Sequence, residues 1–465
     1  MSRPINVKAL LKLEAVLGPS GFTRDSDIIA SHLVEWRGKY SGNTPIMLMP
    51  KTSVELSEII KLANNEKFEL CIQGGNSGLV GAQIPFGEVL ISLKRMNQIR
   101  AISAADDTII AEAGVVLANI HTAAKKIDRQ FPVSLASNGS ATIGGLISTN
   151  AGGVHVRRYG MMRNHILGLE VVLPSGEIIS ELSPLRKDNS GYDLKQLFIG
   201  SEGTLGVITA ACVKLAPNPQ NRIVALAGID NPEAAVIALR HLENQTGAVS
   251  AFEIMNRQSF EFGLKNLIGA KNPLTGVFPF IALVEFECMH DDISYENALS
   301  ALLEAGVLLD VTIAQNAAQN EAFWLIREGM SAAQKPEGLA VKHDISVPIS
   351  QISEFFQTAK LTAQRIVQGA RIAAFGHIGD GNIHYDVLRP ISMSDADYRE
   401  FIPIITAQIN DVVVSLGGSI SAEHGIGVAK RDEFLAREPK VQIELMRGIK
   451  NLMDPNNILN PRVLL

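Results

Sequence analysis

The feature that most constrains this chain is the segment Ile372–His384, which places His377 and His384 on either side of Asp380-Gly381. An Asp-Gly pair between apolar and β-branched residues predicts a hairpin whose two loop residues both take positive φ. With that loop, His377 would pair directly with His384. Opposed residues have Cβ atoms roughly 5 Å apart, so both imidazoles could bind one cation.

A carboxylate and a third histidine, Glu423-His424, follow later in the chain. Glu423 would complete a metal site with His377 and His384 and leave open coordination positions, as catalytic zinc sites do. We expect a divalent metal, in the first place zinc, although two histidines and a carboxylate also suit manganese or iron(II).

Composition predicts a large globular protein. A chain of 465 residues favours two or three domains, each with its own core. No apolar run is long enough for a transmembrane segment, and the net charge of -6 without a basic stripe argues against nucleic acid as a partner. Cys71, Cys212 and Cys288 lie in separate apolar contexts and predict buried thiols in a reducing compartment, so we expect a cytoplasmic location.

The hydrophobic pattern predicts an α+β fold with a domain boundary in the proline-containing linker 217–221. In the first half we expect strands at 68–73, 89–93, 108–113, 166–173 and 205–215 and a helix near 117–127. In the second half, strands at 222–229, 279–287, 371–378 and 383–388 alternate with helices at 232–244, 293–305, 350–367, 395–415 and 438–453. This alternation is typical of helices packed on an antiparallel sheet.

Four segments of the first half are rich in glycine: 73–81, 139–145, 149–153 and 200–206. Glycines let backbone N–H groups converge on an anion, so a loop that follows a strand, such as 74–78, is a candidate pyrophosphate cradle. Four such segments in one domain indicate a large cofactor bound along the backbone. None matches G-x-G-x-x-G or the P-loop, which argues against a Rossmann dinucleotide site and against nucleoside triphosphate hydrolysis.

These segments, with Tyr159-Gly160 and the strand sequence LGLEVVL at 167–173, resemble the FAD-binding domain of the vanillyl-alcohol oxidase and p-cresol methylhydroxylase flavoproteins. The second half resembles the cap domain of their D-2-hydroxyacid dehydrogenase branch, which includes D-2-hydroxyglutarate dehydrogenase, D-lactate dehydrogenase and the glycolate oxidase D subunit. The resemblance covers roughly residues 40–465 and implies a two-subdomain FAD-binding domain followed by an antiparallel-sheet-plus-helices cap that binds the substrate.

The implied domains are an N-terminal helical arm at 1–40, the FAD-binding domain at 41–218, the cap at 219–450 and a C-terminal segment returning to the flavin at 451–465. The resemblance implies flavin contacts from the glycine segments, the strand after them and the C-terminal end. The implied residues are Gly74, Gly75, Asn76, Ser77, Gly78, Gly81, Gly139, Ser140, Thr142, Gly145, Asn150, Gly152, Gly153, Glu202, Val207, Ile208, Asn382 and Asn460. Asn76 and Ser77 stand where relatives with covalent flavin often have a histidine, so we expect non-covalent FAD.

Oxidation of a 2-hydroxy acid by flavin needs a base, an alkoxide-stabilising group and a carboxylate anchor. The metal would lower the pKa of the hydroxyl, and His424 is the expected base. Arg327 and Ser331, at i and i+4 of an expected helix, with Lys342 nearby, would bind the carboxylate. The resemblance assigns the same roles to these positions.

Two departures from the family pattern concern the substrate. Ser331 replaces the more usual threonine, and Asp386 stands where the 2-hydroxyglutarate enzymes have asparagine, so an extra negative charge near the substrate could disfavour a dicarboxylate. We therefore expect D-2-hydroxyglutarate as the leading substrate and D-lactate or glycolate as the alternative. The expected electron acceptor is an electron-transfer flavoprotein or a quinone, and a homodimer is possible.

Two functions of other classes stay open at this point. One is a non-catalytic flavin-binding subunit of a multi-subunit oxidase, and the other is a metal hydrolase without flavin. The complete set His377, His384, Glu423 and His424 argues against the first, and the glycine segments argue against the second. Flavin colour, and its bleaching by a 2-hydroxy acid without oxygen, would separate the three.

Overall fold

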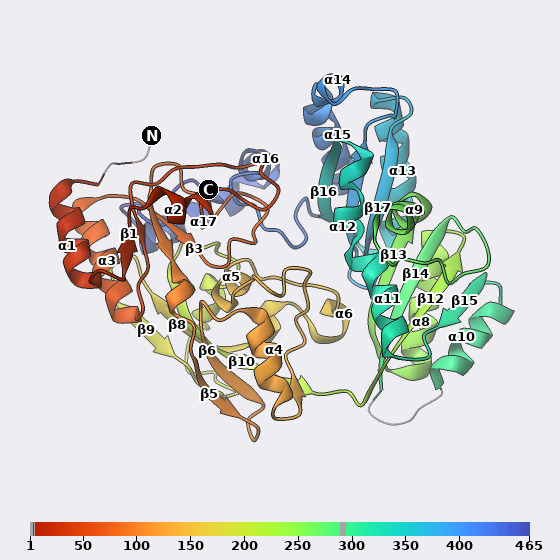
Figure 1. Cartoon of the computed structure of the whole chain (residues 1–465), viewed down its shortest axis with the longest axis horizontal. Helices are drawn as coiled ribbons and strands as arrows, with labels where there is room; N and C mark the ends of the chain where they lie inside the picture. The colour runs from red at the N-terminus through yellow and green to blue at the C-terminus, as the bar shows by residue number, and fades with distance from the viewer. Residues whose placement is uncertain (1–2, 4, 289–293) are drawn as a thin grey trace. The chain divides into compact units, whose positions relative to one another are not determined.

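The computed structural model describes residues 3, 5–288 and 294–465, and the chain divides into two compact units (Figure 1). The first unit comprises Met1–Gly153, Gly160–Asn218 and Glu423–Leu465, and the second comprises Val154–Tyr159 and Pro219–Ala422. Residues 423–450 therefore fall in the first unit, whereas the sequence analysis assigned them to the cap.

The first unit contains a mixed four-stranded sheet in the order β1-β2-β4-β3, in which β2 and β3 run parallel to β4. The helix α3 begins where the side chain of Thr52 accepts a hydrogen bond from the amide of Glu55. Its apolar residues recur at helical spacing and pack into the hydrophobic core of this subdomain. The elements around this sheet are β1 Phe22–Thr23, β2 Met47–Leu48, β3 Leu70–Gln73, β4 Val89–Ser92, α1 Val7–Leu17, α2 Ser26–Ala30 and α3 Ser53–Glu66.

A second sheet of the first unit has five antiparallel strands in the order β5-β6-β10-β8-β9. The helices α4 and α5 share a separate hydrophobic core with this sheet, so the FAD-binding region has two subdomains, as expected. The elements are β5 Ile99–Ser103, β6 Thr108–Glu112, β8 Ile166–Val172, β9 Ile178–Glu181, β10 Val207–Lys214, α4 Leu117–Lys125, α5 Ile143–Ser148 and α7 Lys195–Phe198, with β7 Arg129–Gln130 paired to β11 Ala216–Pro217.

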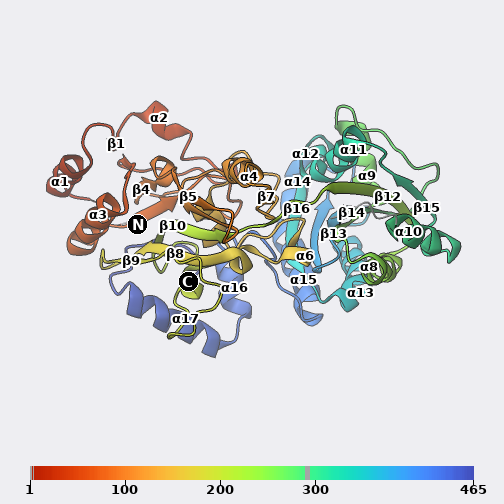
Figure 2. The same cartoon turned by 90° about the horizontal axis from the view of Figure 1, so that it is seen from below.

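The C-terminal segment belongs to the first unit although it is far from it in sequence. Its helices α16, Arg431–Arg437, and α17, Lys440–Met453, are seen in Figure 2. Beyond them, Leu459 forms a parallel bridge with Leu70 of β3, and the buried Lys450 donates to the carbonyls of Thr204 and Leu459. The chain end is thus joined to the edge of the first sheet.

The second unit is built on a seven-stranded antiparallel sheet in the order β15-β12-β14-β13-β17-β18-β16. Its strands are β12 Asn221–Ile229, β13 Val249–Asn256, β14 Phe280–Cys288, β15 Asp310–Ile313, β16 Ala340–Ser346, β17 Arg371–His377 and β18 Asn382–Leu388. Its helices are α6 Val156–Tyr159, α8 Pro232–Thr246, α9 Arg257–Asn266, α10 Ser294–Glu304, α11 Ala317–Glu328, α12 Met330–Ala333, α13 Ile352–Ile366, α14 Asp395–Arg399 and α15 Ile402–Ser415. The antiparallel sheet with helices agrees with the expected cap.

The two faces of this sheet differ in character because side chains alternate along each strand. One face, with Phe252, Val284 and Tyr385, packs into the core of α8, α10, α13 and α15. The opposite face carries a smaller apolar cluster with α9, α11 and α12 and, beside it, a group of buried polar residues. The candidate active site lies on this second face.

Several elements of this unit differ from those expected. Residues 395–415, expected as one helix, form α14 and α15, because Pro403 in the first turn of α15 lacks an amide hydrogen and cannot continue a helix from α14. The strands β13 and β16 were not expected, since their polar residues alternate with apolar ones only briefly. Both strands carry residues of the site.

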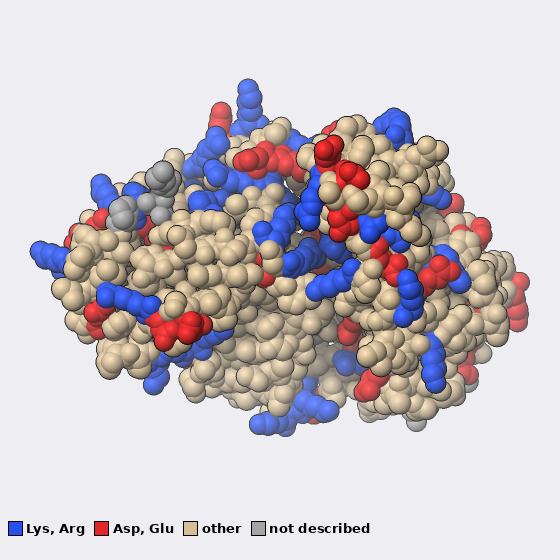
Figure 3. Space-filling model, turned by 45° about the horizontal axis from the view of Figure 1, so that its top comes forward, with Lys and Arg blue, Asp and Glu red and all other residues tan. Residues whose placement is uncertain are grey.

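The surface and the thiols agree with the composition. Figure 3 shows acidic and basic side chains interspersed on one face. Cys71, Cys212 and Cys288 are buried thiols, as expected. Among the described residues, no helix combines the length and the apolar character that crossing a bilayer requires.

Candidate active site

The hairpin of β17 and β18 differs in register from the one expected. His377 pairs with Asn382, and His384 pairs with Phe375. The loop therefore has four residues, 378–381, and it closes through amides of Asp380 and Gly381 that donate to the carbonyl of His377. Of the two expected loop residues, Gly381 alone takes a positive φ, 82°. The two-residue Asp-Gly turn, and with it the direct pairing of the histidines, is wrong, since this longer loop needs only one left-handed residue.

The two histidines nevertheless lie on the same face of the sheet. His384 is two residues beyond the partner of His377, which makes the pair diagonal neighbours across the ladder. Their ring centroids are 5.9 Å apart and their planes are nearly perpendicular. His377 is buried and His384 is half-buried. The expected convergence of two imidazoles therefore survives the change of register.

Glu253 on β13 is the direct cross-strand partner of His377. Its carboxylate accepts from Nδ1 of His377 at 2.6 Å and from Nε of Arg327 at 2.6 Å, and it has no exposed surface. Burial alone would raise the pKa of this carboxyl, but the charges and hydrogen bonds of Arg327 and His377 hold it below its usual range. The sequence analysis missed Glu253; a lone acid in the apolar stretch 251–255 was the available signal.

Arg327 lies at the end of α11 with only 5% of its surface exposed. Its Nε donates to Glu253, and its guanidinium stacks 4.9 Å from the ring of Phe375. Its Nη2 is buried and has no partner among the described residues. An unsatisfied buried donor is costly, so this nitrogen is suited to an anionic ligand.

Ser331 is half-buried in α12, after a break at Gly329 that separates α11 from α12. Arg327 and Ser331 therefore belong to two consecutive helices, whereas a single helix was expected from the sequence.

Lys342 and Asp386 are paired across β16 and β18. Nζ of Lys342 lies 2.8 Å from Oδ2 of Asp386 and 3.2 Å from the side-chain oxygen of Gln334. Asp386 is buried, whereas Lys342 is exposed. The negative charge that the sequence analysis placed near the substrate is thus neutralised by Lys342 within the fold.

Asn382 lies between His377 and Ser346 in the same row of the sheet. Its Nδ2 donates to Oδ1 of Asp344 and to the carbonyl of Ile345, while its buried Oδ1 has no partner among the described residues. Asp344, which the sequence analysis missed, also lies 3.7 Å from Nδ1 of His384. The side-chain oxygen of Asn382 is therefore a second unsatisfied buried group on this face.

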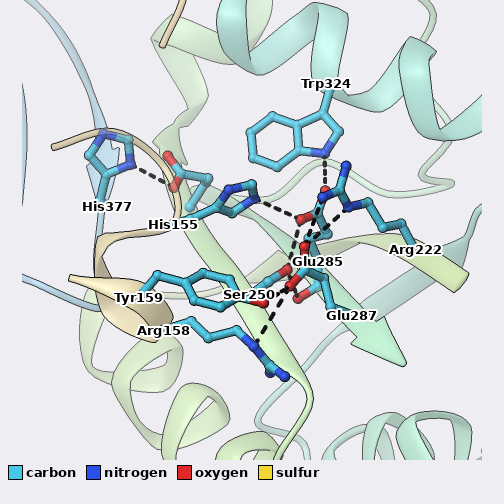
Figure 4. A network of polar contacts seen from close by, with 10 residues as sticks. His155, Arg158, Tyr159, Arg222, Ser250, Glu285, Glu287, Trp324 and His377 are labelled. Atoms are coloured by element: carbon cyan, nitrogen blue, oxygen red, sulfur yellow. Dashed lines mark hydrogen bonds and ion pairs between the residues drawn. The ribbon is translucent and has the colours of Figure 1, made fainter. Parts of the chain in front are cut away.

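A separate buried network lies on the same face of the sheet (Figure 4). Glu285 accepts from His155 at 2.9 Å, from the hydroxyl of Ser250 at 2.7 Å and from the indole of Trp324 at 2.9 Å. Burial would raise the pKa of Glu285, but His155 and Ser250 lower it to about 2. His155 thus anchors the short segment 154–159 to the sheet.

Glu287 extends this network along β14. It accepts from the hydroxyl of Tyr159 and from the guanidinium of Arg222, and Arg158 lies 3.7 Å away. The ligand atoms of His155, Glu285 and Glu287 are close enough to hold a metal ion. However, both carboxylates already receive protein donors, two of them from arginine in the case of Glu287, so neither carboxylate needs a cation.

In the first unit, the first two glycine segments pack backbone against backbone. A Cβ on Gly74 would lie 2.5 Å from Oγ1 of Thr142, and a Cβ on Gly75 would lie 1.8 Å from the carbonyl of Ser140. Glycine is therefore required at both positions. Oγ1 of Thr142 is buried and has no partner among the described residues. The segments 73–81 and 139–145 thus form a cradle with an unsatisfied hydroxyl, which fits an anionic group of a cofactor.

The loop after β3 is held in shape by its own side chains. Asn76 takes a left-handed conformation with φ of 56° and donates to the carbonyls of Ser31 and Val34. Its side-chain oxygen accepts from Gln83, which also donates to the carbonyl of Gly78. Asn76 therefore shapes the loop, and its role as a direct flavin contact stays a prediction.

Three other expected cofactor residues have structural partners. Asn150 has φ of 49°, and its side-chain oxygen accepts from the amide of Arg163. Val207 and Ile208 at the start of β10 are buried in two different hydrophobic cores. The remaining expected flavin residues, Ser77, Gly81, Gly139, Gly145 and Gly152, lie in the expected loops and helix start, and their contacts with the cofactor stay predictions.

Glu202 holds the loop that follows His424. Its buried carboxylate accepts from the amides of Ile426 and Gly427, both at 2.8 Å, and burial raises its pKa. Asn460 in turn donates to the carbonyl of Glu202 and accepts from the amide of Ile72. The side chains of Glu202 and Asn460 therefore position backbone, a role that the sequence analysis did not foresee.

Glu423 and His424 are both half-buried in the first unit. The carboxylate of Glu423 accepts from the amide of Gly153 at 3.0 Å, so it is tied to an expected flavin-lining glycine. After His424, the amides of Val428 and Ala429 both donate to the carbonyl of Val80 at the end of the first glycine loop. The expected base therefore lies on a fixed loop.

Two family models match the chain. The model described as FAD binding domain matches residues 45–181, and the model described as FAD linked oxidases, C-terminal domain, matches residues 218–464. The chain belongs to the FAD-linked oxidase family. The cradle of the first unit is thus an FAD-binding domain, and the resemblance found in the sequence is confirmed.

Curated relatives match nearly the whole chain. A probable mitochondrial D-2-hydroxyglutarate dehydrogenase of Oryza sativa subsp. indica is 37% identical, covering 96% of this chain and 80% of the relative. The mitochondrial D-2-hydroxyglutarate dehydrogenase of Arabidopsis thaliana is 34% identical, covering 98% and 81%. A D-2-hydroxyglutarate–pyruvate transhydrogenase of Saccharomyces cerevisiae is 35% identical, covering 93% and 89%.

Solved structures agree on the fold. p-Cresol methylhydroxylase with substrate bound has a TM-score of 0.76 at 16% identity, covering 99% of this chain and 98% of that chain. Alkyldihydroxyacetonephosphate synthase has a TM-score of 0.76 at 18% identity, covering 99% and 86%. The fold class expected from the sequence, of the p-cresol methylhydroxylase type, is confirmed.

Because the hydroxyl of Thr142 has no partner among the described residues of the protein, we expect its removal to raise the stability of the FAD-free protein and to lower its affinity for FAD. We expect Thr142→Val to stabilise the FAD-free protein by about 1 kcal/mol, because a buried donor without a partner is removed. The same change should weaken FAD binding about 10-fold, because a hydrogen bond to the cofactor is lost. Urea unfolding of the apoprotein and FAD titration followed by fluorescence measure the two effects.

Thr209→Val is the matched control. Its buried hydroxyl already donates to Glu170 at 2.8 Å, so its loss should destabilise the apoprotein and leave FAD affinity unchanged. Unchanged FAD affinity in Thr142→Val would contradict the assignment of this hydroxyl to the cofactor.

Proposed function

We propose that this protein oxidises D-2-hydroxyglutarate to 2-oxoglutarate, with FAD as the electron acceptor and with the help of a divalent metal. The names of the relatives supply the substrate. The observation that carries the proposal is the buried guanidinium nitrogen of Arg327, which has no partner among the described residues and shares its sheet face with two converging histidines. Such a donor is suited to a carboxylate of the substrate.

In this proposal, the substrate carboxylates are bound by Arg327, Ser331 and Lys342. Arg327 offers Nη2, because its Nε is already bonded to Glu253. The half-buried hydroxyl of Ser331 and the exposed ammonium of Lys342 would add weaker contacts. Arginine binds carboxylates through two parallel donors, so Arg327 would fix the orientation of the acid.

His377, His384 and Glu423 are the proposed metal ligands. Nδ1 of His377 is bonded to Glu253, which directs its Nε2 as the metal-binding nitrogen, and the ring of His384 is a diagonal neighbour. Further support comes from chain continuity, because the amide of Ala422 donates to the carbonyl of Asp344, the residue paired with His384, and Glu423 is the next residue. The donor set fits zinc, and a bound metal would lower the pKa of the substrate hydroxyl.

The chain's own residues would then accept the proton of the substrate hydroxyl. Bound FAD supplies the hydride acceptor for the substrate Cα. His424 would take the hydroxyl proton as the general base. The backbone that follows His424 is held by hydrogen bonds to Glu202 and to the carbonyl of Val80, which would limit where the ring can lie. Arg327 would hold the acid so that the Cα–H bond keeps its orientation.

The function is tested by anaerobic reduction of the bound flavin with D- and L-2-hydroxy acids. We expect D-2-hydroxyglutarate to bleach the flavin absorbance fastest and the L-enantiomer to be inert. Removal of metals with a chelator should slow this reduction by orders of magnitude, and added Zn²⁺ should restore it, because alkoxide stabilisation is lost and regained. Rates that chelation does not change would contradict the metal, and a flavin that none of these acids reduces would contradict the dehydrogenase.

His424→Ala tests the base. We expect flavin reduction to slow by about 10²- to 10⁴-fold, the usual contribution of general base catalysis, while FAD content stays that of the wild type. Stopped-flow absorbance gives the rate, and the flavin spectrum gives the content. Higher pH should partly restore the variant, because hydroxide can replace the missing base. A wild-type rate in His424→Ala would remove His424 from this role.

One observation favours a second candidate, a D-lactate or glycolate dehydrogenase. The ammonium of Lys342 is already paired with Asp386 at 2.8 Å, so it offers little net charge to a second carboxylate. A substrate with one carboxylate would need only Arg327. This alternative matches the substitution of aspartate for the asparagine expected at position 386.

Asp386→Asn separates the two candidates. The asparagine amide carries no charge, so it does not neutralise Lys342 as the carboxylate of Asp386 does. We therefore expect KM for D-2-hydroxyglutarate to fall roughly 5-fold, equivalent to about 1 kcal/mol, while KM for D-lactate changes little. Steady-state assays with an artificial electron-accepting dye measure both constants. Lys342→Met is the control and should raise KM for the dicarboxylate alone. Equal changes for both substrates would show that Asp386 does not determine specificity.

A further inference from the structure

We propose that Glu253 is a positioning residue that serves the metal ligand and the substrate anchor at once. This inference rests on the proposed function. Its basis is the geometry of one carboxylate with two short hydrogen bonds, Oε1 to Nδ1 of His377 and Oε2 to Nε of Arg327, both at 2.6 Å. These are hydrogen bonds between charged or polar side chains that are all buried.

The bond to His377 selects one tautomer of its neutral ring. A carboxylate can only accept, so the ring nitrogen that faces Glu253 carries the hydrogen, and in the neutral imidazole the lone pair is then on Nε2. A metal binds the nitrogen with the lone pair, and carboxylates that orient ligand histidines in this way strengthen metal binding. Because Glu253 and His377 are directly paired on β13 and β17, the backbone ladder holds both residues in position.

The bond to Arg327 uses only part of its guanidinium. Nε is bonded to Glu253, the ring of Phe375 lies 4.9 Å away, and Nη2 has no protein partner among the described residues. Glu253 therefore orients the guanidinium and compensates its charge without occupying Nη2. One buried carboxylate thus sets the orientation of the two groups that would bind the hydroxyl and the carboxylate of the substrate.

Glu285 differs from Glu253 in the residues to which its carboxylate is hydrogen-bonded. It is a buried glutamate on the same sheet face, but its donors are His155, Ser250 and Trp324, none of which belongs to the proposed substrate or metal site. Glu285→Gln removes one buried carboxylate charge, as Glu253→Gln does. It is therefore a matched control for the general cost of losing a buried charge.

The test measures two dissociation constants that do not depend on turnover. Zn²⁺ affinity is measured by competition with a chromophoric chelator, and 2-oxoglutarate affinity is measured in the metal-free protein from the change in flavin absorbance. In Glu253→Gln we expect the Zn²⁺ constant to rise about 10- to 100-fold, as for other residues that orient ligand histidines, and the 2-oxoglutarate constant to rise as well. FAD content and thermal unfolding report whether the variant is folded.

Glu253→Asp keeps the charge but is one methylene shorter, so it should reach only one of the two partners and give intermediate losses. Glu285→Gln should leave both constants unchanged. The proposal is wrong if folded Glu253→Gln keeps either wild-type constant, or if Glu285→Gln raises both as much. If Glu253→Gln does not fold, Glu253→Asp decides alone, and wild-type constants in it contradict the proposal. A wild-type protein that binds neither Zn²⁺ nor 2-oxoglutarate would instead contradict the proposed function.

Discussion

The site of the second unit depends on the alternation of side chains across one antiparallel sheet. The face toward α8, α10, α13 and α15 is apolar and supplies the main hydrophobic core. The same strands must then place their other residues on the opposite face, where burial makes every unpaired charge costly. Glu253, Glu285 and Asp386 are each paired with cations or neutral donors there. The sheet thus holds these carboxylates in a buried setting, where hydrogen bonds and ion pairs are stronger than in water.

Pairing on that face is nearly complete, and its exceptions are informative. Nη2 of Arg327 and Oδ1 of Asn382 are buried without a partner among the described residues, and Oγ1 of Thr142 is one of several such atoms in the first unit. A folded protein rarely leaves such atoms unsatisfied unless a ligand completes them. The family membership supplies FAD for the first unit, and a hydroxy acid is the group proposed for the second. These three atoms therefore lie in the regions where FAD and the proposed hydroxy acid would bind.

The first unit holds its functional loops by backbone hydrogen bonds. Glu202 binds the amides after His424, Asn460 binds Glu202, and the carbonyl of Val80 accepts from two amides of the same C-terminal loop. Segments from four distant parts of the sequence meet in this way. Loops fixed at their backbone can present side chains with little loss of entropy when a ligand binds. This explains why Glu202 and Asn460 matter although their own side chains are occupied by the protein.

Hydrophobic periodicity and strand alternation are local properties of the chain, so the sequence by itself predicted an α+β fold in two halves and a common sheet face for His377 and His384. The glycine segments by themselves indicated only a large cofactor, and its identity as FAD followed from the family resemblance. The sequence did not determine the hairpin register, since the same sequence is compatible with a four-residue loop and with a two-residue loop. Nor did it reveal Glu253, Asp344 or the second role of Glu202. Their functions arise from partners on other strands and loops, so only tertiary pairing across the sheet decided that a buried carboxylate would meet a histidine and an arginine.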